Sequence, residues 1–304
     1  MDFTIDAFQR ELKTGIRKQL GVLGHPAEED PQALWCALSE LALPALEAPA
    51  GSGGLELGLS NSVVAWEELG AATVCGPLWS SVFAIDCAVG ADPDGPLGGA
   101  LPGLLSGESR ADVTGLGAVT PAVDGVLVRI DSTGPFALSG SGLTSAGLGT
   151  AVSRARIRQA AFLVGMAREA LDIAAAHVRE REQFGHKLVD FEAVSFPLAA
   201  LLIDLEASRL AVHRAAWLAD TGKTAELAAT EVLAGAGDLL ATAARTAIHV
   251  HGTRGLLRTN RVSRIYLRAR DEIPRLGSPR ALWRRAGLLR LTGGIDPDDR
   301  AAIC

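Results

Sequence analysis

The segment 179–192, REREQFGHKLVDFE, has the residue types and spacing best suited to chemistry in this sequence. It places a Phe-Gly pair between two charged clusters and interrupts a long run rich in alanine and leucine. Arg181 at a helix end can bind a phosphate through two parallel hydrogen bonds, Gln183 can hydrogen-bond the same group, and Phe184 offers an apolar surface. Gly185 allows the backbone to turn back tightly and is expected to end the helix. These residue types could bind a phosphate, and a salt bridge of Arg181 within its own helix is the structural alternative.

Other motifs that carry chemistry are absent from the sequence. It has no GxxxxGK(S/T) phosphate loop, no GxGxxG after a strand, no GxSxG elbow and no HExxH. His249 and His251 would point apart on a helix, so together they make a poor metal pair. The cysteines are Cys36, Cys75, Cys87 and Cys304. Because none has CxxC spacing or a neighbouring His cluster, no metal site is predicted, and we expect buried thiols in a reducing compartment.

The elements that must position these residues are mainly helices. The periodicity predicts helices over 3–20, 31–43 and 61–73, the last capped by Asn61 and Ser62, and then a β segment of three to five strands. A long helix is expected from about Ala151, followed by helices over 191–220 (capped by Asp190), 224–250 and 260–271, and one starting at Ser278-Pro279. We therefore expect three domains: helical (1–106), shortened β (107–152) and a carboxy-terminal helical bundle (153–304).

Charge is unevenly spread along the 304 residues. Residues 1–150 carry 6 Lys+Arg and 18 Asp+Glu, giving −12, whereas residues 151–304 carry 23 and 17, giving +6; the chain total is −6. The second half could face phosphates or an acidic partner, or the halves could only neutralise one another. Few aromatics interleave with the basic residues, which argues against nucleic-acid binding. No secretory h-region or run of about 18 apolar residues is evident, so we expect a cytoplasmic protein without a membrane span.

Three segments resemble the acyl-CoA dehydrogenase family. The first is a long helix ending in RxQFG, then a short loop and FEAVSFPLAALLIDLEASR. The second is AIHVHGTRGLLRTNRVSRIYLRARDEIPRLGSP, which is similar to the Q-x-hGG-x-G and EGT segments of the family. The third is ALPALEAPAGSGGLELGLSNSVVAWEELGAA, which is similar to its amino-terminal domain. The resemblance covers both ends of the chain, with gaps.

The resemblance implies a fold, a cofactor and a reaction. The family has an amino-terminal helical domain, a central β domain and a carboxy-terminal four-helix bundle, with FAD at a subunit interface. A glutamate removes the α proton of an acyl-CoA and the flavin accepts the β hydride. By resemblance, a set of residues contacts FAD, and the FAD diphosphate that they reach is that of the neighbouring subunit. These residues are Arg181, Gln183, Phe184, Glu192, His249, Gly252 and Thr253.

The sequence departs from the family pattern at three places. The two positions where the family carries its base hold Leu276 and Ala155, which cannot accept a proton. The nearby carboxylates Asp271 and Glu272 would have to reach the site from a different turn. The β segment is under half the usual length, and no tryptophan occurs between residues 79 and 217. Glu192 replaces the usual Gln, and a carboxylate near a phosphate repels it. The catalytic base is therefore unknown.

These departures lead to one main hypothesis and two alternatives. The chain resembles the small, degenerate subunit of heteromeric actinobacterial acyl-CoA dehydrogenases of steroid catabolism, which would share FAD with a full-length partner subunit. A redox-neutral enzyme of secondary metabolism and a non-catalytic scaffold are the alternatives. Between Arg254 and Arg290 there are 11 arginines, and Arg254, Arg258, Arg261, Arg264 and Arg268 would form one uncompensated helical face, favouring an acidic partner or a phosphate.

Overall fold

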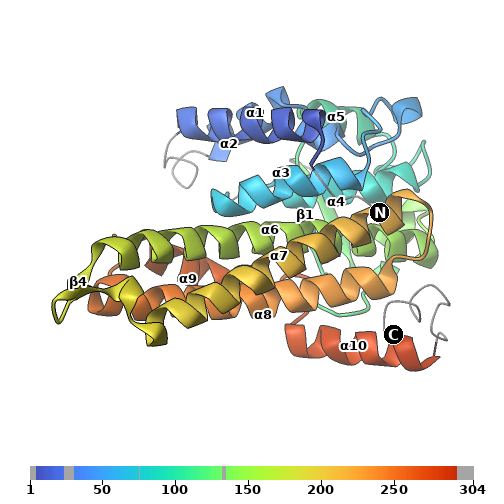
Figure 1. Ribbon diagram of the computed structural model, residues 1–304. Coiled ribbons are helices and arrows are strands. Elements are labelled where there is room, and N and C mark those ends of the chain that lie inside the picture. The colour runs from blue at the N-terminus through green and yellow to red at the C-terminus, as the bar shows by residue number, and fades with distance from the viewer. Residues whose placement is uncertain (1–4, 24–30, 75, 132–134, 293–304) are drawn as a thin grey trace.

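The computed structural model describes residues 5–23, 31–74, 76–131 and 135–292, and within them the chain is mainly helical, as predicted. The amino-terminal helices lie above the carboxy-terminal helical domain in Figure 1, with a small sheet behind them. The amino-terminal helices are α1 (Ala7–Leu23), α2 (Pro31–Glu40), α3 (Leu59–Ala71), α4 (Leu78–Val89) and α5 (Leu101–Ser106). The carboxy-terminal helices are α6 (Ser145–Glu180), α7 (Glu192–Asp220), α8 (Glu226–His251), α9 (Arg261–Glu272) and α10 (Pro279–Thr292).

The central sheet has three short antiparallel strands in the order β1-β2-β3. They are β1 (Ala111–Thr114), β2 (Leu127–Ile130) and β3 (Phe136–Ala137). Val113 lies opposite Val128 in the β1–β2 register, and Val128 and Ile130 alternate inward and are buried. The Ala111 amide donates to the Ser81 hydroxyl of α4 at 3.0 Å, which anchors the sheet to the amino-terminal helices.

Helix α6 is the central element of the core. It begins at Ser145, earlier than the predicted start at Ala151, because the Thr144 hydroxyl caps it by accepting from the Gly147 amide at 3.1 Å. Helix α3 crosses it with almost no side chain between the backbones. A Cβ on Gly165 would lie 1.9 Å from the Glu67 carbonyl oxygen, and one on Gly70 would lie 2.0 Å from the Phe162 carbonyl oxygen. These glycines therefore set how closely the two helices approach.

The start of α3 differs from the prediction in both position and cap. The helix begins at Leu59, and neither Asn61 nor Ser62 caps it. Instead, the amides of Leu59 and Ser60 donate to the Asp220 carboxylate at 2.7 and 2.8 Å. Since Asp220 ends α7, the carboxy-terminal domain supplies the cap of an amino-terminal helix.

Helix α8 is the one helix in the described part of the chain that is long and apolar enough, by length and composition, to cross a membrane, contrary to the expectation that no such run exists. It packs against α6, α7, α9 and α10, and 61% of its apolar window is buried inside the fold. Its composition is accounted for by the helical core.

The cysteines only partly follow the prediction of buried thiols. Cys87 is buried, and burial raises the pKa of its thiol. Cys36 is exposed, so the prediction was wrong there. Cys75 and Cys304 lie outside the described residues.

Candidate functional site

The segment 181–187 forms a small hairpin at the far end of the helical domain (Figure 1). Strands β4 (Glu182–Gln183) and β5 (His186–Lys187) pair across a two-residue turn. Phe184 and Gly185 occupy the turn with φ of +53° and +78°, the conformation of a type I′ hairpin turn. Helix α6 already ends at Glu180, so Gly185 is a turn residue and not the predicted helix stop.

The hairpin exposes the residues that the sequence singled out. Phe184 is 91% exposed, although a large apolar side chain in a left-handed conformation is rare and strained. Arg181 and Gln183 are also exposed. Within the described residues, the structure records no ion pair of Arg181, so the predicted alternative of a salt bridge to its own helix is not observed. The hairpin therefore presents an arginine and a phenyl ring outward.

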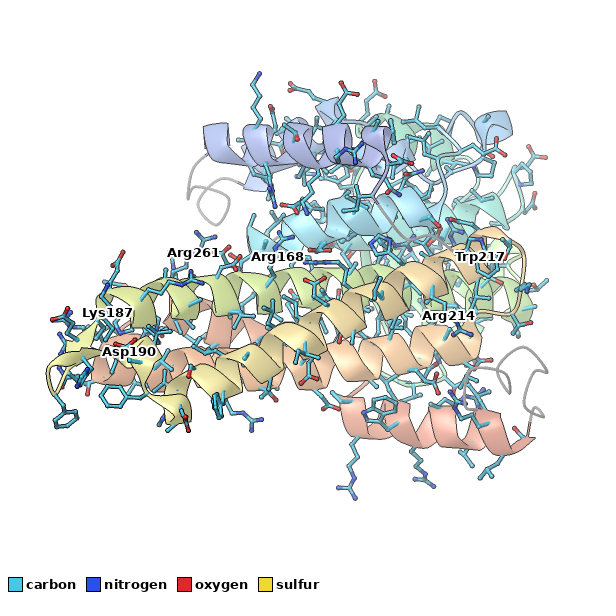
Figure 2. The ribbon with its side chains drawn as sticks, viewed as in Figure 1. Arg168, Lys187, Asp190, Arg214, Trp217 and Arg261 are labelled. Carbon is cyan, nitrogen blue, oxygen red and sulfur yellow. The ribbon has the colours of Figure 1, made fainter. Side chains whose placement is uncertain are left out.

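The base of the hairpin is held by residues between it and α7. The Lys187 amide donates to the Asp190 carboxylate at 3.2 Å, and the His186 and Phe191 rings meet edge to face at 6.2 Å. Figure 2 shows Lys187, in β5 of the hairpin, near Asp190. Asp190 was predicted to cap the following helix, but α7 has Phe191 at its N-cap and no side-chain cap. Glu192, in the first turn of α7, is exposed.

A histidine pair brings the second predicted segment to the hairpin. His177 of α6 stacks on His251 of α8, with ring centroids 4.1 Å apart. The Nδ1 atom of His251 lies 2.7 Å from the Ala247 carbonyl oxygen, which fixes its ring. Because His177 is one turn before Arg181, the stack places the start of the hairpin near the short 3-10 helix η7 (Gly252–Leu256).

The remaining predicted contacts lie on this surface. His249, Gly252 and Thr253 are exposed. Gly252 has φ +58°, and a Cβ there would meet no atom within 4 Å, so the backbone is open to an approaching group. Burial lowers the pKa of His177, and the charges of His251, Arg181 and Arg254 lower it further. This surface is therefore open, and Arg181 and Arg254 place cationic groups near His177.

The arginine stripe does not form as predicted. Arg254 lies in η7, before α9 begins at Arg261, so the five arginines do not share one helical face. Arg261 pairs with Glu169 at 3.1 Å and Arg268 pairs with Glu272 at 2.6 Å. The idea of an uncompensated stripe was wrong, because carboxylates from α6 and α9 neutralise two of its members.

Both positions of the family base lie inside the fold. Leu276 is 1% exposed and Ala155 is fully buried. A Cβ on Gly277 would lie 3.3 Å from Cγ2 of Val119, so the 119–121 loop packs against the segment that holds Leu276. Arg156, adjacent to Ala155, donates to the carbonyl oxygen of that same Val119. Neither position offers a proton acceptor.

Glu272 is the buried carboxylate nearest in sequence to Leu276, and it is engaged elsewhere. It is 2% exposed and accepts from Gln159 at 3.0 Å and from Arg275 at 2.7 and 2.8 Å. Burial alone would raise its pKa, but the hydrogen bond and charge of Arg275, the charge of Arg268 and the bond from Gln159 outweigh burial and lower the pKa. A carboxylate held in this way is a weak base. Asp271 is exposed and pairs at 3.8 Å with Arg270.

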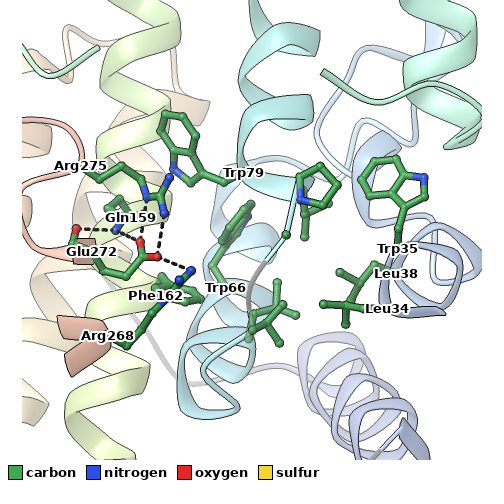
Figure 3. A pocket seen from close by; sticks show the side chains of 15 residues that line it. Leu34, Trp35, Leu38, Trp66, Trp79, Gln159, Phe162, Arg268, Glu272 and Arg275 are labelled. Atoms are coloured by element: carbon green, nitrogen blue, oxygen red, sulfur yellow. Dashed lines mark hydrogen bonds and ion pairs between the residues drawn. The ribbon is translucent and has the colours of Figure 1, made fainter. Parts of the chain in front are cut away.

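The Glu272 cluster fills one side of a small cavity (Figure 3). The cavity, about 30 Å³, is bounded by Trp35, Trp66 and Trp79, with Phe162 beside Gln159. Arg275 lies over the Trp79 ring, 5.4 Å from its centroid. Such a volume holds about two water molecules, so this cavity does not accommodate an acyl chain.

A larger groove runs along the first turns of α6. It has a volume of about 590 Å³ and lies between α6, the 119–121 loop and the α7–α8 turn. Arg156 lines it, is 2% exposed, and has a buried Nε atom without a hydrogen-bond partner. Its other nitrogens donate to Thr230 at 3.2 Å and to Val119. Desolvation and the charge of Arg285 lower the pKa of Arg156 to about 10, against the opposite effect of Glu226, which lines the same groove.

Sequence reasoning missed His177, Gln159 and Arg156. The only sequence feature that pointed to His177 is its position four residues before Arg181 in a helix. Arg156 and Gln159 are polar residues in an otherwise apolar stretch of the core helix, and that break in the pattern was a usable signal. No group of three or more His, Cys, Asp or Glu side chains that could hold a metal is found in the described part of the chain.

Comparison with known proteins agrees with this architecture. Residues 140–273 match the model of the acyl-CoA dehydrogenase C-terminal domain. The chain is 34% identical over 111 residues to the caffeyl-CoA reductase-Etf complex subunit CarC of Acetobacterium woodii, and the match covers 36% of this chain and 29% of that relative. The chain therefore matches less than a third of that relative's length.

Two solved structures share the fold over nearly the whole chain. The Tcur3481-Tcur3483 steroid ACAD superposes with a TM-score of 0.80 at 23% identity, covering 95% of this chain and 99% of that one. The ChsE4-ChsE5 complex from Mycobacterium tuberculosis superposes with a TM-score of 0.75 at 20% identity, covering 96% and 99%. Residues 140–273 therefore belong to the acyl-CoA dehydrogenase C-terminal domain family, and the chain shares the fold of these acyl-CoA dehydrogenase structures.

Proposed function

We propose that this chain is a cytoplasmic subunit of an FAD-dependent acyl-CoA dehydrogenase that desaturates a steroid-derived acyl-CoA between its α and β carbons. It contributes contacts to the FAD diphosphate of a full-length partner chain. The observation that carries the proposal is the contrast between an exposed Arg181–Gly185 hairpin and two buried, apolar base positions. Two structural neighbours of this chain are described as a steroid ACAD and as a two-chain complex.

The exposed residues fit a diphosphate. Arg181 can bind two phosphate oxygens through its planar guanidinium, and Gln183 can donate a further hydrogen bond. The open backbone at Gly252 lets an anionic group approach without meeting a side chain. Glu192 is the first residue of α7 and would favour the adenosine side over the phosphates, since like charges repel. Flavin, when bound, supplies the hydride-accepting chemistry.

The proton-accepting base would come from the partner. Leu276 and Ala155 have no ionisable group, and Glu272 is held by Arg268 and Arg275. A base must reach the α carbon within hydrogen-bonding distance. With Glu272 2% exposed, this chain offers no such group at the family positions.

The groove beside α6 suits the anionic carrier of the substrate. Its buried Arg156 has unused hydrogen-bonding capacity at Nε, and hydroxyls of Thr150 and Thr224 line the same space. A coenzyme A thioester brings several phosphates, which such a groove can bind. The acyl-CoA is therefore proposed to bind in this groove.

Co-expression with a full-length acyl-CoA dehydrogenase chain tests the role of the hairpin. In the purified complex, Arg181→Ala is expected to weaken FAD binding about 10- to 100-fold, the loss of a charge-assisted hydrogen bond, whereas Arg181→Lys loses less. Arg179→Ala is the matched control, since Arg179 is exposed in the last turn of α6. FAD retention is measured by the flavin absorbance of the complex during dilution.

The same preparations separate the alternatives. Stoichiometric FAD in the chain purified alone as a homo-oligomer would sink the proposal. A partner chain that is fully active and retains FAD alone would support a scaffold role instead. Turnover of an acyl-CoA without any change in flavin redox state would support the redox-neutral alternative.

A further inference from the structure

The small cavity bounded by Trp35, Trp66 and Trp79, here called the tryptophan cavity, has two buried hydrogen-bond donors without a partner in the described part of the chain. They are Nε1 of Trp79 and Nε of Arg268, and both residues line the cavity. Trp79 is only 9% exposed, and a buried donor left unpaired destabilises a fold. Two such donors on the wall of one cavity indicate that it holds a group that accepts hydrogen bonds.

Other tryptophans of the chain have partners for their indole N–H groups. Trp35, which bounds the same cavity, donates to the Gly107 carbonyl oxygen at 2.7 Å. Trp283 donates to the Asp238 carboxylate at 2.8 Å. The unpaired N–H of Trp79 is therefore a property of the cavity and not of the tryptophans of this chain in general.

The charges on the cavity wall favour a negatively charged acceptor. Among the described residues that line the cavity, the charged ones are Arg268, Arg275 and Glu272, so two cations face one carboxylate (Figure 3). The arginine side chains are 29% and 33% exposed, so solvent screens part of this excess, but the Nε atom of Arg268 is itself buried. Unpaired donors beside an excess of positive charge bind an anion more strongly than a neutral acceptor.

The bonds already made by Glu272 argue against water as the occupant. Its Oε1 atom accepts from Arg268 at 2.6 Å and from Arg275 at 2.7 Å. Its Oε2 atom accepts from Arg275 at 2.8 Å and from Gln159 at 3.0 Å. With two bonds to each oxygen, the carboxylate has little capacity left for the hydrogens of a trapped water. A halide ion has no hydrogens to place and only accepts.

The size of the cavity limits the anion to a small one. Its volume is about 30 Å³, and apolar side chains such as Leu34, Leu38 and Phe162 form much of its wall. Chloride is only slightly larger than a water molecule and fits such a space, whereas phosphate and sulfate do not. A single charge also suits the apolar wall, because burying an ion becomes more unfavourable as its charge rises.

We propose that the tryptophan cavity binds a small monovalent anion of the size of chloride, which accepts hydrogen bonds from the N–H groups of Trp79 and Arg268. The cavity lies where α2, α3 and α4 meet α6 and α9, so the bound ion stabilises the junction between the amino-terminal helices and the carboxy-terminal domain. The inference does not depend on the proposed flavin function.

Thermal unfolding of the full chain in sodium chloride tests the site, with sodium gluconate at equal ionic strength as the control salt, because gluconate is too large for the cavity. Chloride should raise the unfolding temperature of the wild type in a saturable way, since a ligand that binds only the folded state stabilises it. Trp79→Phe keeps an aromatic ring but removes the donor, and it should weaken chloride binding about 10-fold or more. Trp283→Phe is the matched control and should keep the wild-type affinity, because Trp283 already donates to Asp238.

Glu272→Gln provides a test of the opposite sign. Because this change removes the competing carboxylate charge, chloride affinity should rise about 3-fold or more. Broadening of the chloride NMR line on binding measures the affinity of each folded variant without relying on its stability. An unfolding temperature of the wild type that is the same in both salts would show that the cavity holds only water. Equal affinities of the wild type and Trp79→Phe, or no rise in Glu272→Gln, also contradict the proposal.

Discussion

At the residue scale, Glu272 explains how a carboxylate can lie beside Leu276 and still not serve as a base. Three donors from two helices and one loop, Gln159, Arg268 and Arg275, converge on it. Their charges and hydrogen bonds stabilise the ionised form against the cost of burial. The buried carboxylate thus closes the space in front of the tryptophans and joins α6 to α9.

Removing the charge of Glu272 should destabilise the fold. Glu272→Gln leaves Arg268 and Arg275 without their carboxylate, and we expect a loss of about 2 kcal/mol, below the roughly 3–5 kcal/mol for fully buried pairs because both arginines are partly solvated. Asp271→Asn is the control, since Asp271 is exposed, and it should change stability by less than about 0.5 kcal/mol. Urea unfolding measures the change in stability of both variants. Equal changes would contradict the role assigned to Glu272.

The same carboxylate predicts a pH dependence. The pKa of Glu272 is lower in the folded chain than in the unfolded one, so its contribution is complete above the unfolded pKa and is lost as pH falls through the folded pKa. The gap in unfolding free energy between wild type and Glu272→Gln should therefore be constant near neutral pH and narrow below about pH 4. A gap that widens on acidification would reverse the assigned direction.

At the element scale, the contact between α3 and α6 is set by backbone approach. Gly70 and Gly165 leave no room for a Cβ against the opposing carbonyls, and Asp220 caps the first turn of α3 from the end of α7. Both interactions join the amino-terminal helices to the carboxy-terminal domain. The position of α3, and of the tryptophan cavity above α6, depends on them.

Two alanine substitutions in α6 separate helix propensity from packing. Gly165→Ala should destabilise the fold by about 1–3 kcal/mol, because the new methyl group forces the helices apart. Gly149→Ala, where a Cβ meets nothing within 4 Å, should stabilise it by about 0.5–1 kcal/mol. Thermal and urea unfolding measure the change in stability of both variants. The structure requires these two changes to have opposite signs.

At the scale of the whole molecule, the opposite charges of the two halves meet inside the fold. Arg158 of α6, 1% exposed, pairs with Glu47 at 2.7 Å and with Asp86. Arg168 and Arg209 similarly bind Glu67 of α3. Part of the charge asymmetry is therefore satisfied within one chain.

Removing the ion pairs of Arg158 should destabilise the fold by weakening the contact between the two halves of the chain. Arg158→Met leaves Glu47 and Asp86 with one fewer buried cation, and we expect a loss of about 3–5 kcal/mol. Arg129→Met removes an exposed pair with Asp112 and should cost less than about 1 kcal/mol. Chemical unfolding distinguishes them, and a small effect of Arg158→Met would show that the pair contributes little beyond packing.

The sequence predicted the helices well where local rules decide them, and less well where distant residues do. Asn260 caps α9 and Ser278 caps α10, accepting from the Ala281 amide at 3.4 Å, as their local chemistry suggests. The cap of α3 was missed because Asp220 is 161 positions from Leu59. The end of α6 was misplaced because Gly185 signals a turn in both a helix stop and a hairpin.

The sequence by itself determined the mainly helical architecture, the short β segment, the Arg181–Gly185 segment and the lack of a base at Leu276 and Ala155. The first three follow from residue type and local spacing, whereas the two base positions follow from the resemblance to the family. Only the tertiary structure decided that His177 and His251 join the hairpin to Gly252, that Glu272 is held by arginines, and that the outer face of α7 stays exposed. Periodicity gives the apolar faces of a helix, but which face the chain covers depends on how distant segments pack.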